Sequence, residues 1–175
     1  MFQYVELSHQ GVFGIRSIPN IDARGDFLRI LEIQNLREQF VPCEISLATN
    51  IASGTLRGMH FQKGKNSEAK TISCISGKVF DVGVDLRQNS QSFLRSICVE
   101  LGPKCEYQGL FLPSGYAHGY LSLEDNSQLI YTMDKPFSLI DASGYLWNDK
   151  AFDIPWPISP KLISDKDLSW AEFKR

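Results

Sequence analysis

The sequence contains three histidines, His9, His60 and His118. The stretch "TLRGMHFQ" places His60 three positions after Arg57, and His118 lies among small residues in "PSGYAHGYL". A histidine is an effective base near neutral pH, and an arginine binds phosphate or carboxylate groups. Small residues beside a histidine let a ligand approach the backbone closely. These residues indicate acid–base chemistry on an anionic ligand, and the simpler alternative for His60 is a partly buried histidine that makes one hydrogen bond.

Three further positions could take part in such chemistry. Lys70 opens the strand-like run "KTISCIS", where it could stabilise an oxyanion or simply be solvated. Tyr131 in "LIYTMD" could serve a site or belong to the core with its hydroxyl satisfied. Asp165 and Asp167 in "SDKD" are explained most simply as residues that cap a helix. The residue types alone therefore leave the reaction open.

A bound metal ion is not expected. The common metal site of small β-barrels uses two histidines separated by one residue, then a carboxylate and a third histidine. The residue two positions after His60 is Gln62, and His118 is the one histidine in the later half of the chain. A transition metal normally needs more nitrogen or carboxylate ligands than this. The sequence therefore predicts that no metal takes part.

The elements that must position these residues are mostly short strands. Ten apolar-rich runs, most of them separated by Gly, Pro, Asn or Ser, predict strands. They cover residues 11–19, 26–33, 43–49, 55–62, 69–76, 78–86, 92–101, 105–113, 117–124 and 127–134. Short helices are predicted over residues 32–40 and 165–173, and the stretch 147–167, rich in proline and aromatics, predicts an irregular strap over the body. The sequence predicts one all-β domain over residues 1–175, a jelly-roll sandwich or barrel with a few short helices.

Composition narrows the class of function. The 175 residues are 43% hydrophobic and 22% charged, and the net charge of −2 does not favour nucleic acid or an anionic membrane. No apolar run approaches the roughly 20 residues that span a bilayer, and the N-terminal stretch lacks the features of a signal peptide, so a cytoplasmic location is expected. Cys43, Cys74, Cys98 and Cys105 form no CxxC pair and predict reduced, structural thiols.

Taken together, the motifs resemble the dTDP-4-dehydrorhamnose 3,5-epimerase family of nucleotide-sugar epimerases. The matching pieces are "DARGDF", "GTLRGMHFQ", "AKTISCISGKVFDVGVDLR", "LFLPSGYAHGYLSLED", "LIYTMD", "GYLWNDKAFDIPWP" and "LISDKD", in the family's order over nearly the whole chain. The resemblance implies a cupin-type jelly roll that uses no metal or cofactor. It also implies a nucleotide-sugar substrate and a homodimer in which an N-terminal strand contributes to the partner's site.

The resemblance implies a role for each candidate residue. The substrate would be a nucleoside-diphospho-4-keto-6-deoxy sugar, whose C3 and C5 protons lie next to a carbonyl. His60 would be the base, supported by Asp167, with Tyr131 as the acid opposite and Lys70 beside the enolate oxygen. The implied substrate-binding residues are Arg24, Phe27, Arg29, Asn50, Arg57, Gln62 and His118, with Phe27 placed to stack on the nucleotide base.

Three positions depart from the pattern of the thymidine-linked enzymes. Arg29 stands where the family usually has a glutamate, and Ser46, Ala48 and Asn50 replace a Q-x-N-x-S pattern. Both changes fall near the nucleotide base, so a CDP- or GDP-linked sugar is an alternative to a dTDP-linked one. Phe137 replaces a second tyrosine, which makes inversion at C3 alone or C5 alone an alternative to inversion at both. Alternatives of other classes are a 3,4-ketoisomerase, a sugar-nucleotide-binding protein without activity, and a metal-dependent cupin.

Overall fold

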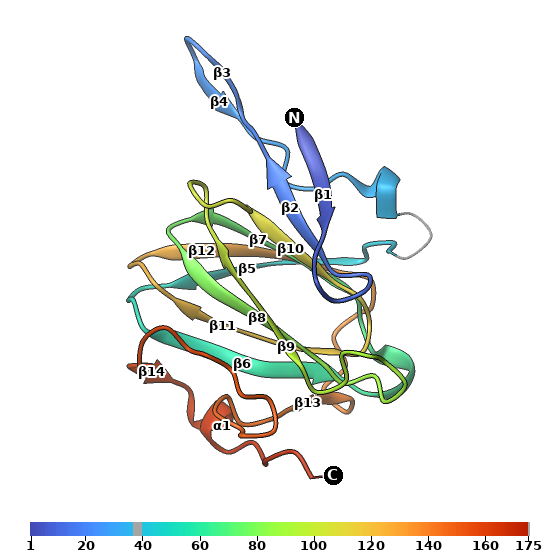
Figure 1. Ribbon diagram of the computed structural model, residues 1–175. Coiled ribbons are helices and arrows are strands. Elements are labelled where there is room, and N and C mark those ends of the chain that lie inside the picture. Colours follow the sequence, from blue (N-terminus) through green and yellow to red (C-terminus); the bar gives the residue numbers. More distant parts are fainter. Residues whose placement is uncertain (37–39, 175) are drawn as a thin grey trace.

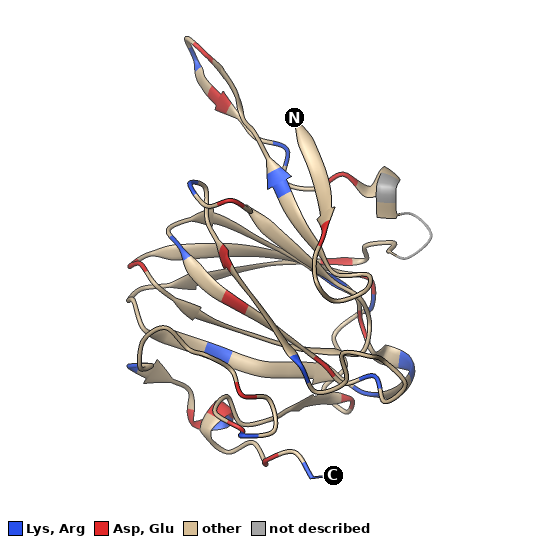
Figure 2. Ribbon diagram, viewed as in Figure 1, with Lys and Arg blue, Asp and Glu red and all other residues tan. Residues whose placement is uncertain are grey.

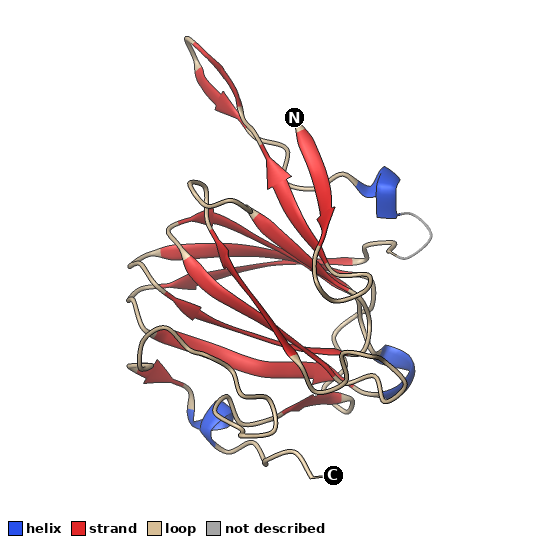
Figure 3. Ribbon diagram, viewed as in Figure 1, coloured by secondary structure: helices blue, strands red, loops and turns tan. Residues whose placement is uncertain are grey.

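The computed structural model describes residues 1–36 and 40–174, and nearly all of its regular structure is β-strand (Figure 3). Two sheets face each other as a sandwich (Figure 1). In order, the first sheet contains β1 (Phe2–Glu6), β2 (Phe13–Ser17), β10 (Gly109–Leu112), β7 (Lys70–Ser76), β12 (Ser127–Met133) and β5 (Glu44–Asn50). The second contains β13 (Ala142–Gly144), β6 (Thr55–Gln62), β11 (Tyr116–Ser122), β8 (Val79–Asp85) and β9 (Ser96–Leu101), and β14 (Leu162–Ile163) runs parallel to β6. The predicted cupin-type jelly roll is confirmed.

A separate hairpin extends away from the sandwich at the N-terminal end of the chain (Figure 1). It consists of β3 (Asn20–Asp22) and β4 (Gly25–Phe27), and all of its residues are exposed. Two of them, Ile21 and Phe27, are large apolar side chains that are 79% and 71% exposed. The projection therefore carries exposed apolar surface at both of its strands.

Nine of the ten predicted strand segments contain most or all of a strand, because alternating or continuous apolar residues pack between the sheets or on their outer faces. The prediction over residues 26–33 is wrong beyond Phe27. There the chain leaves the hairpin, and β2, the neighbouring strand, is already paired on both sides, with β1 and β10. The sequence did not predict β1, β3, β13 or β14.

Helical structure is shorter than predicted. The two 3-10 turns are η1 (Ile33–Leu36) and η2 (Gly64–Asn66), and residues 37–39 of the predicted helix 32–40 lie outside the described residues. The predicted helix 165–173 is a single turn, α1 (Asp165–Leu168). Its cap is Ser164, whose Oγ accepts a hydrogen bond from the Asp167 amide at 3.1 Å. The capping role suggested for the two aspartates is therefore wrong.

Apolar clusters hold the sandwich together, and two of those among the described residues bear on the site. The largest fills the space between the sheets and includes Ile72, Leu110 and Leu129, all fully buried. A second covers the outer face of the second sheet, where Phe152 from the C-terminal strap packs on Met59. The predicted strap is thereby confirmed, and it fixes the position of the C-terminal residues relative to β6.

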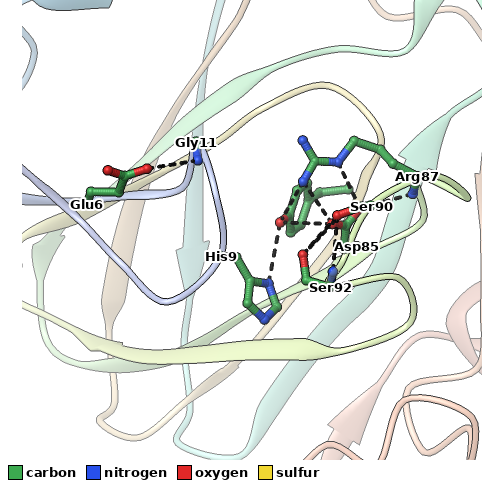
Figure 4. A network of polar contacts seen from close by, with 8 residues as sticks. Glu6, His9, Gly11, Asp85, Arg87, Ser90 and Ser92 are labelled. Carbon is green, nitrogen blue, oxygen red and sulfur yellow. Dashed lines mark hydrogen bonds and ion pairs between the residues drawn. The ribbon is translucent and has the colours of Figure 1, made fainter.

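Charged residues of both signs are interspersed along the chain (Figure 2). The densest polar network surrounds Asp85 at the end of β8 (Figure 4). Its fully buried carboxylate accepts hydrogen bonds from Arg87 at 2.9 and 2.8 Å, Ser90 at 2.6 Å and Ser92 at 2.7 Å. Burial raises the pKa of this carboxyl, but these hydrogen bonds outweigh burial and hold the pKa of Asp85 well below its ordinary value. The network connects the 87–92 loop to β8 and stabilises that end of the sheet.

The cysteines form no disulfide: Cys43, Cys74, Cys98 and Cys105 are all free thiols. Cys74 is buried in the core, where burial raises the pKa of its thiol to about 12. Cys43 is exposed, so the prediction of a structural role is wrong for this residue.

Candidate active site

The candidate site is a cavity of about 410 Å³ between the two sheets. It adjoins a second hollow of about 300 Å³, and both are lined by Ser46, Arg57, His60, Lys70 and Tyr131. These residues come from β5, β6, β7 and β12, so both sheets contribute. The first cavity is also lined by Glu44, Phe61, Gln62, Glu68, Met133, Lys135, Phe137, Ala142, Ser143, Ser164, Lys166, Asp167 and Trp170.

A bulge in β6 brings Arg57 and His60 to the same cavity. On a regular strand, residues three positions apart point to opposite faces. In the pairing of β6 with β11, His60 lies opposite His118 and Arg57 lies opposite Tyr120, with a register shift between them. Two residues of β6 therefore face one residue of β11, and the extra residue restores both side chains to the same face. The bulge therefore explains how Arg57 and His60, three positions apart, can line one cavity although a regular strand would place them on opposite faces.

Glycine is required at the bulge. Gly58 has a φ of +148°, and a Cβ placed there would lie 2.6 Å from the Gly119 Cα. The two backbones can approach this closely only because neither residue has a side chain. The Gly58 amide also donates a hydrogen bond to Asp167 Oδ2 at 3.3 Å.

His60 and Asp167 form a histidine–carboxylate pair. His60 Nε2 lies 2.6 Å from Asp167 Oδ1, although the two residues are 107 positions apart in the chain. Asp167 is only 3% exposed, and Trp170 Nε1 donates a further hydrogen bond to Oδ1 at 3.3 Å. Burial raises the pKa of this carboxyl, but the hydrogen bond and charge of His60 outweigh it, so the pKa of Asp167 lies below its ordinary value. The carboxylate is thus ionised at neutral pH and directs the other ring nitrogen of His60 away from itself, as a base requires.

Tyr131 supplies a protonated hydroxyl to the same cavity. Burial, followed by the charges of Tyr120 and Asp81, raises the pKa of Tyr131 well above its ordinary value. Its ring packs edge-on against the His118 ring, with centroids 5.7 Å apart. A phenol that keeps its proton across the physiological pH range can act as a general acid.

Lys70 lies at the start of β7 and is 7% exposed. Its Nζ is 2.7 Å from Glu68 Oε1, and Glu68 is itself 9% exposed. An ammonium group beside the cavity can stabilise negative charge that develops on a bound molecule.

Asn50 and Gln62, both predicted to bind substrate, use their side-chain amides for hydrogen bonds to other residues of the chain. Asn50 is 1% exposed, and its Oδ1 accepts hydrogen bonds from Arg57 Nε at 3.1 Å and from the Tyr120 hydroxyl at 2.9 Å. Asn50 therefore orients Arg57. Gln62 Nε2 donates to the carbonyls of Asn66 and Pro136 at 3.1 and 3.2 Å, which fastens the chain beside the cavity.

His118 lines the second hollow from β11. It is 5% exposed, and its Nε2 lies 3.0 and 2.9 Å from the two oxygens of the fully buried Asp81. The carboxylate fixes the orientation of the ring, so His118 presents a defined edge to the hollow.

The remaining predicted binding residues lie outside the cavity of a single chain. Arg24 and Phe27 belong to the projecting hairpin, and Arg29 follows it. Arg24 pairs with Asp22 at 2.6 Å, and Arg29 lies 3.6 Å from Glu32. In the described chain, none of the three lines the cavity that contains His60.

Several lining residues escaped the sequence analysis, namely Glu68, Lys135, Ser143, Ser164, Lys166 and Trp170. Lys166 lies in the same "SDKD" motif as Asp167, and its Nζ is 5.5 Å from the centre of the Trp170 ring. The sequence signal that could have identified Lys166 was its position between Asp165 and Asp167, in a motif already assigned to the site. Glu68 lies just before β7, outside the predicted strand, and the sequence carried no signal of its burial.

Among residues 1–36 and 40–174, no three His, Cys, Asp or Glu side chains come together where they could hold a metal ion. Over the same residues, the structure contains no helix with the length and apolar character needed to cross a membrane.

Comparisons with known proteins agree with this geometry. The profile of the family described as dTDP-4-dehydrorhamnose 3,5-epimerase matches residues 6–175. The chain is 34% identical to the dTDP-4-dehydrorhamnose 3,5-epimerase of Shigella flexneri over 156 residues, which cover 87% of this chain and 85% of that one.

Two crystal structures show the likeness in three dimensions. The dTDP-4-dehydrorhamnose 3,5-epimerase of Bacillus anthracis, with TDP and PPi bound, superposes with a TM-score of 0.91 at 29% identity, covering 99% of this chain and 100% of that one. ChmJ of Streptomyces bikiniensis, a 3'-monoepimerase in complex with dTDP-quinovose, gives a TM-score of 0.85 at 25% identity, covering 95% and 85%. The profile match, together with the histidine–carboxylate pair, the lysine and the tyrosine around one cavity, shows that this chain belongs to the dTDP-4-dehydrorhamnose 3,5-epimerase family.

Proposed function

We propose that this protein is a cofactor-independent epimerase of a dTDP-linked 4-keto-6-deoxy sugar and inverts C3 and C5 in the synthesis of a deoxysugar. The observation that carries the proposal is the placement of His60, Asp167, Lys70 and Tyr131 around one cavity in a chain of this family. Isomerisation of this kind needs no redox group, because the C–H bond broken lies next to an existing carbonyl.

His60 would remove the proton. Its ring borders the cavity, and Asp167 holds it at 2.6 Å and stabilises the imidazolium that forms. The electron pair of the C–H bond moves into the sugar to give an enolate, with negative charge on the C4 oxygen. Lys70 at the cavity wall would stabilise that charge.

Tyr131 would return a proton from the opposite face of the ring. Its raised pKa keeps the hydroxyl protonated until the enolate is formed. Protonation from the face opposite His60 inverts the carbon, whereas return of the proton by His60 restores the substrate. Inverting both C3 and C5 requires the sugar to present each carbon in turn to the same two residues.

Arg57 and His118 would bind the diphosphate or the sugar. Arg57 is held by Asn50 at 3.1 Å and borders both hollows, where its planar guanidinium suits phosphate oxygens. Ser46 and Ala48, which stand in place of larger amide residues, line the second hollow. Small side chains there leave room for the larger base guanine and offer no amide to pair with thymine, so a GDP- or CDP-linked sugar is a second candidate.

Inversion at a single carbon is a further candidate, favoured by Phe137. Phe137 lines the cavity and is 63% exposed, and it offers no hydroxyl to the sugar. The similar ChmJ is a 3'-monoepimerase, so one-carbon chemistry is compatible with this fold.

The active form would be a homodimer in which each hairpin enters the partner's site. The support is that Arg24 and Phe27 lie outside their own cavity, on a hairpin whose apolar residues are exposed. In the partner, Phe27 would stack on the nucleotide base, with Arg24 and Arg29 near the nucleotide. A cytoplasmic location is part of the proposal, and the four free thiols are compatible with a reducing compartment.

The test is incubation in D2O with dTDP-, CDP- and GDP-linked 4-keto-6-deoxy sugars separately, with NMR of C3 and C5. The proposal predicts deuterium at both carbons and inverted product with the dTDP sugar. Exchange with another nucleotide, or at one carbon only, would support the corresponding alternative. A moved carbonyl would identify a ketoisomerase, and no exchange with any of the three would reject the proposal.

A further inference from the structure

A buried ion pair adjoins the cavity that contains His60. Glu68 Oε1 lies 2.7 Å from Lys70 Nζ, and the two residues are 9% and 7% exposed. Both line the cavity wall from the start of β7 and the residues just before it. In the described part of the chain, Glu68 is the sole ionic partner of Lys70.

The Glu68 carboxylate has only one of its two oxygens in a polar contact. Among the described residues, Glu68 Oε2 is the sole buried side-chain nitrogen or oxygen without a hydrogen-bond partner. Neighbouring acids bond to the backbone: Asp134 accepts from the Ala69 amide at 2.8 Å, and Glu44 accepts from the Phe137 amide at 2.8 Å. Glu68 makes no such backbone contact, so its polar interactions within the described chain are directed to Lys70 alone.

A buried carboxylate with an unsatisfied oxygen is costly for stability, and a better-packed apolar residue would avoid that cost. A lysine also has four rotatable bonds, and its ammonium has no fixed position unless an acceptor holds it. A carboxylate at 2.7 Å removes that freedom. The ion pair therefore fixes the position of the Lys70 ammonium group at the cavity wall.

We propose that Glu68 is a positioning residue of the epimerisation, which holds the Lys70 ammonium where the enolate oxygen forms. The inference rests on the proposed function, because it assigns Lys70 the role of stabilising the enolate. Glu68 itself need not touch the sugar. Its effect on the reaction passes through Lys70, so it should lower the barrier to enolate formation and leave substrate affinity nearly unchanged.

The test compares Glu68→Gln, Glu68→Asp and a matched control by steady-state kinetics and by the rate of deuterium incorporation from D2O. Glutamine keeps the size of the side chain and removes its charge. Aspartate keeps the charge on a shorter side chain. The control is Glu100→Gln. Glu100 is an exposed residue of β9 whose Oε2 lies 3.0 Å from Lys78 Nζ, so this substitution also removes the charge of a glutamate paired with a lysine.

E68Q is expected to lower kcat and the exchange rate roughly 10- to 100-fold, with KM within about threefold of wild type. E68D is expected to lie between wild type and E68Q, because charge matters more than length. E100Q is expected to match wild type. In a Lys70→Met background, adding E68Q is expected to change the exchange rate little, since both substitutions remove one interaction.

Other results would overturn the inference. A raised KM with unchanged kcat in E68Q would show that Glu68 binds substrate directly, and wild-type kinetics would show that it has no role. A full additional loss in the Lys70→Met background would show that it acts independently of Lys70. If E68Q does not fold, E68D carries the test, and wild-type kcat in E68D rejects the inference. If wild type exchanges deuterium and the Glu68 variants exchange it at the same rate, this inference alone is rejected. If wild type shows no exchange, the proposed function is rejected as well.

Discussion

At the scale of single residues, the site depends on how buried carboxylates orient cationic or neutral partners. Asp167 orients His60, Asp81 orients His118, and Glu68 contacts Lys70. In each case the acid is almost fully buried and its partner borders the cavity or the adjoining hollow. A low-dielectric surrounding makes such contacts stronger and more directional than they would be in water.

The substitution Asp167→Asn tests the first of these pairs. An amide carries no charge to stabilise the imidazolium, and its NH2 group can favour the wrong ring tautomer of His60. We expect kcat to fall about 100- to 10,000-fold, measured as epimerised product by NMR. Asp165→Asn, in the same helical turn but exposed, is the control and should retain activity. Activity of the Asp167 variant within a few-fold of wild type would contradict the role assigned to the pair.

Sequence reasoning singled out the four proposed catalytic residues but did not predict Glu68 or the contacts of Asn50. His60, Lys70, Tyr131 and Asp167 were predicted from motifs, and all four line the cavity. Glu68 was not predicted, because a glutamate before a strand is usually solvated and nothing in the sequence reveals its burial. The internal role of Asn50 was also out of reach, since it depends on a contact with Tyr120, seventy positions away.

At the scale of elements, the strands were predictable because their apolar residues alternate or run continuously. The bulge in β6 was not predicted: the isolated glycine Gly58 in "LRGMHF" is a signal of a bulge or a close backbone approach, but it does not fix which residue is the extra one. The lengths of the helices were overestimated for a related reason. Apolar spacing in "DKDLSWAEF" fits a helix, but after Leu168 the chain leaves the turn, and Trp170 and Phe173 pack against His60 and Tyr145.

The bulge itself can be tested with Gly58→Ala. The added Cβ would lie 2.6 Å from the Gly119 backbone, at a φ of +148°. We expect a loss of about 2–4 kcal/mol in the free energy of unfolding, measured by urea denaturation. Gly64→Ala is the matched control, because Gly64 also has a positive φ, of +61°, but its Cβ would meet open space. That variant should lose only about 1 kcal/mol. Equal losses in the two variants would show that φ strain, rather than the close approach of β6 and β11, makes Gly58 necessary.

At the scale of the whole molecule, the projecting hairpin is the feature that a single chain does not explain. Its apolar residues Ile21 and Phe27 are exposed, and β5, at the edge of the first sheet, exposes Ile45 and Leu47 at 74% and 61%. A symmetric dimer would cover such surfaces on both chains at once. The strand β1 was not among the strands predicted from apolar runs, because "FQYVE" is short and its apolar residues do not form a continuous run.

Mixed dimers test whether the hairpin completes the partner's site. Arg24→Ala and His60→Ala chains, each expected to be nearly inactive alone, would be co-expressed with different tags. In a mixed dimer with exchanged hairpins, one site regains both residues and the other loses both. Random pairing should therefore restore about a quarter of wild-type activity. No gain over the separate variants would show that Arg24 does not act in the partner's site.

The C-terminal strap has a consequence for the timing of synthesis on the ribosome. Every strand of the two main sheets except β14 is complete by Gly144, whereas the carboxylate that orients His60 is Asp167, supplied by the strap after β14. A nascent chain can thus form most of the sandwich, with His60, Lys70 and Tyr131 already on its strands, before the partner of the base has been translated. The histidine–carboxylate pair therefore forms late, when the strap docks on β6, and a fragment ending before Ser164 would have most of the sandwich strands while its histidine lacked the carboxylate.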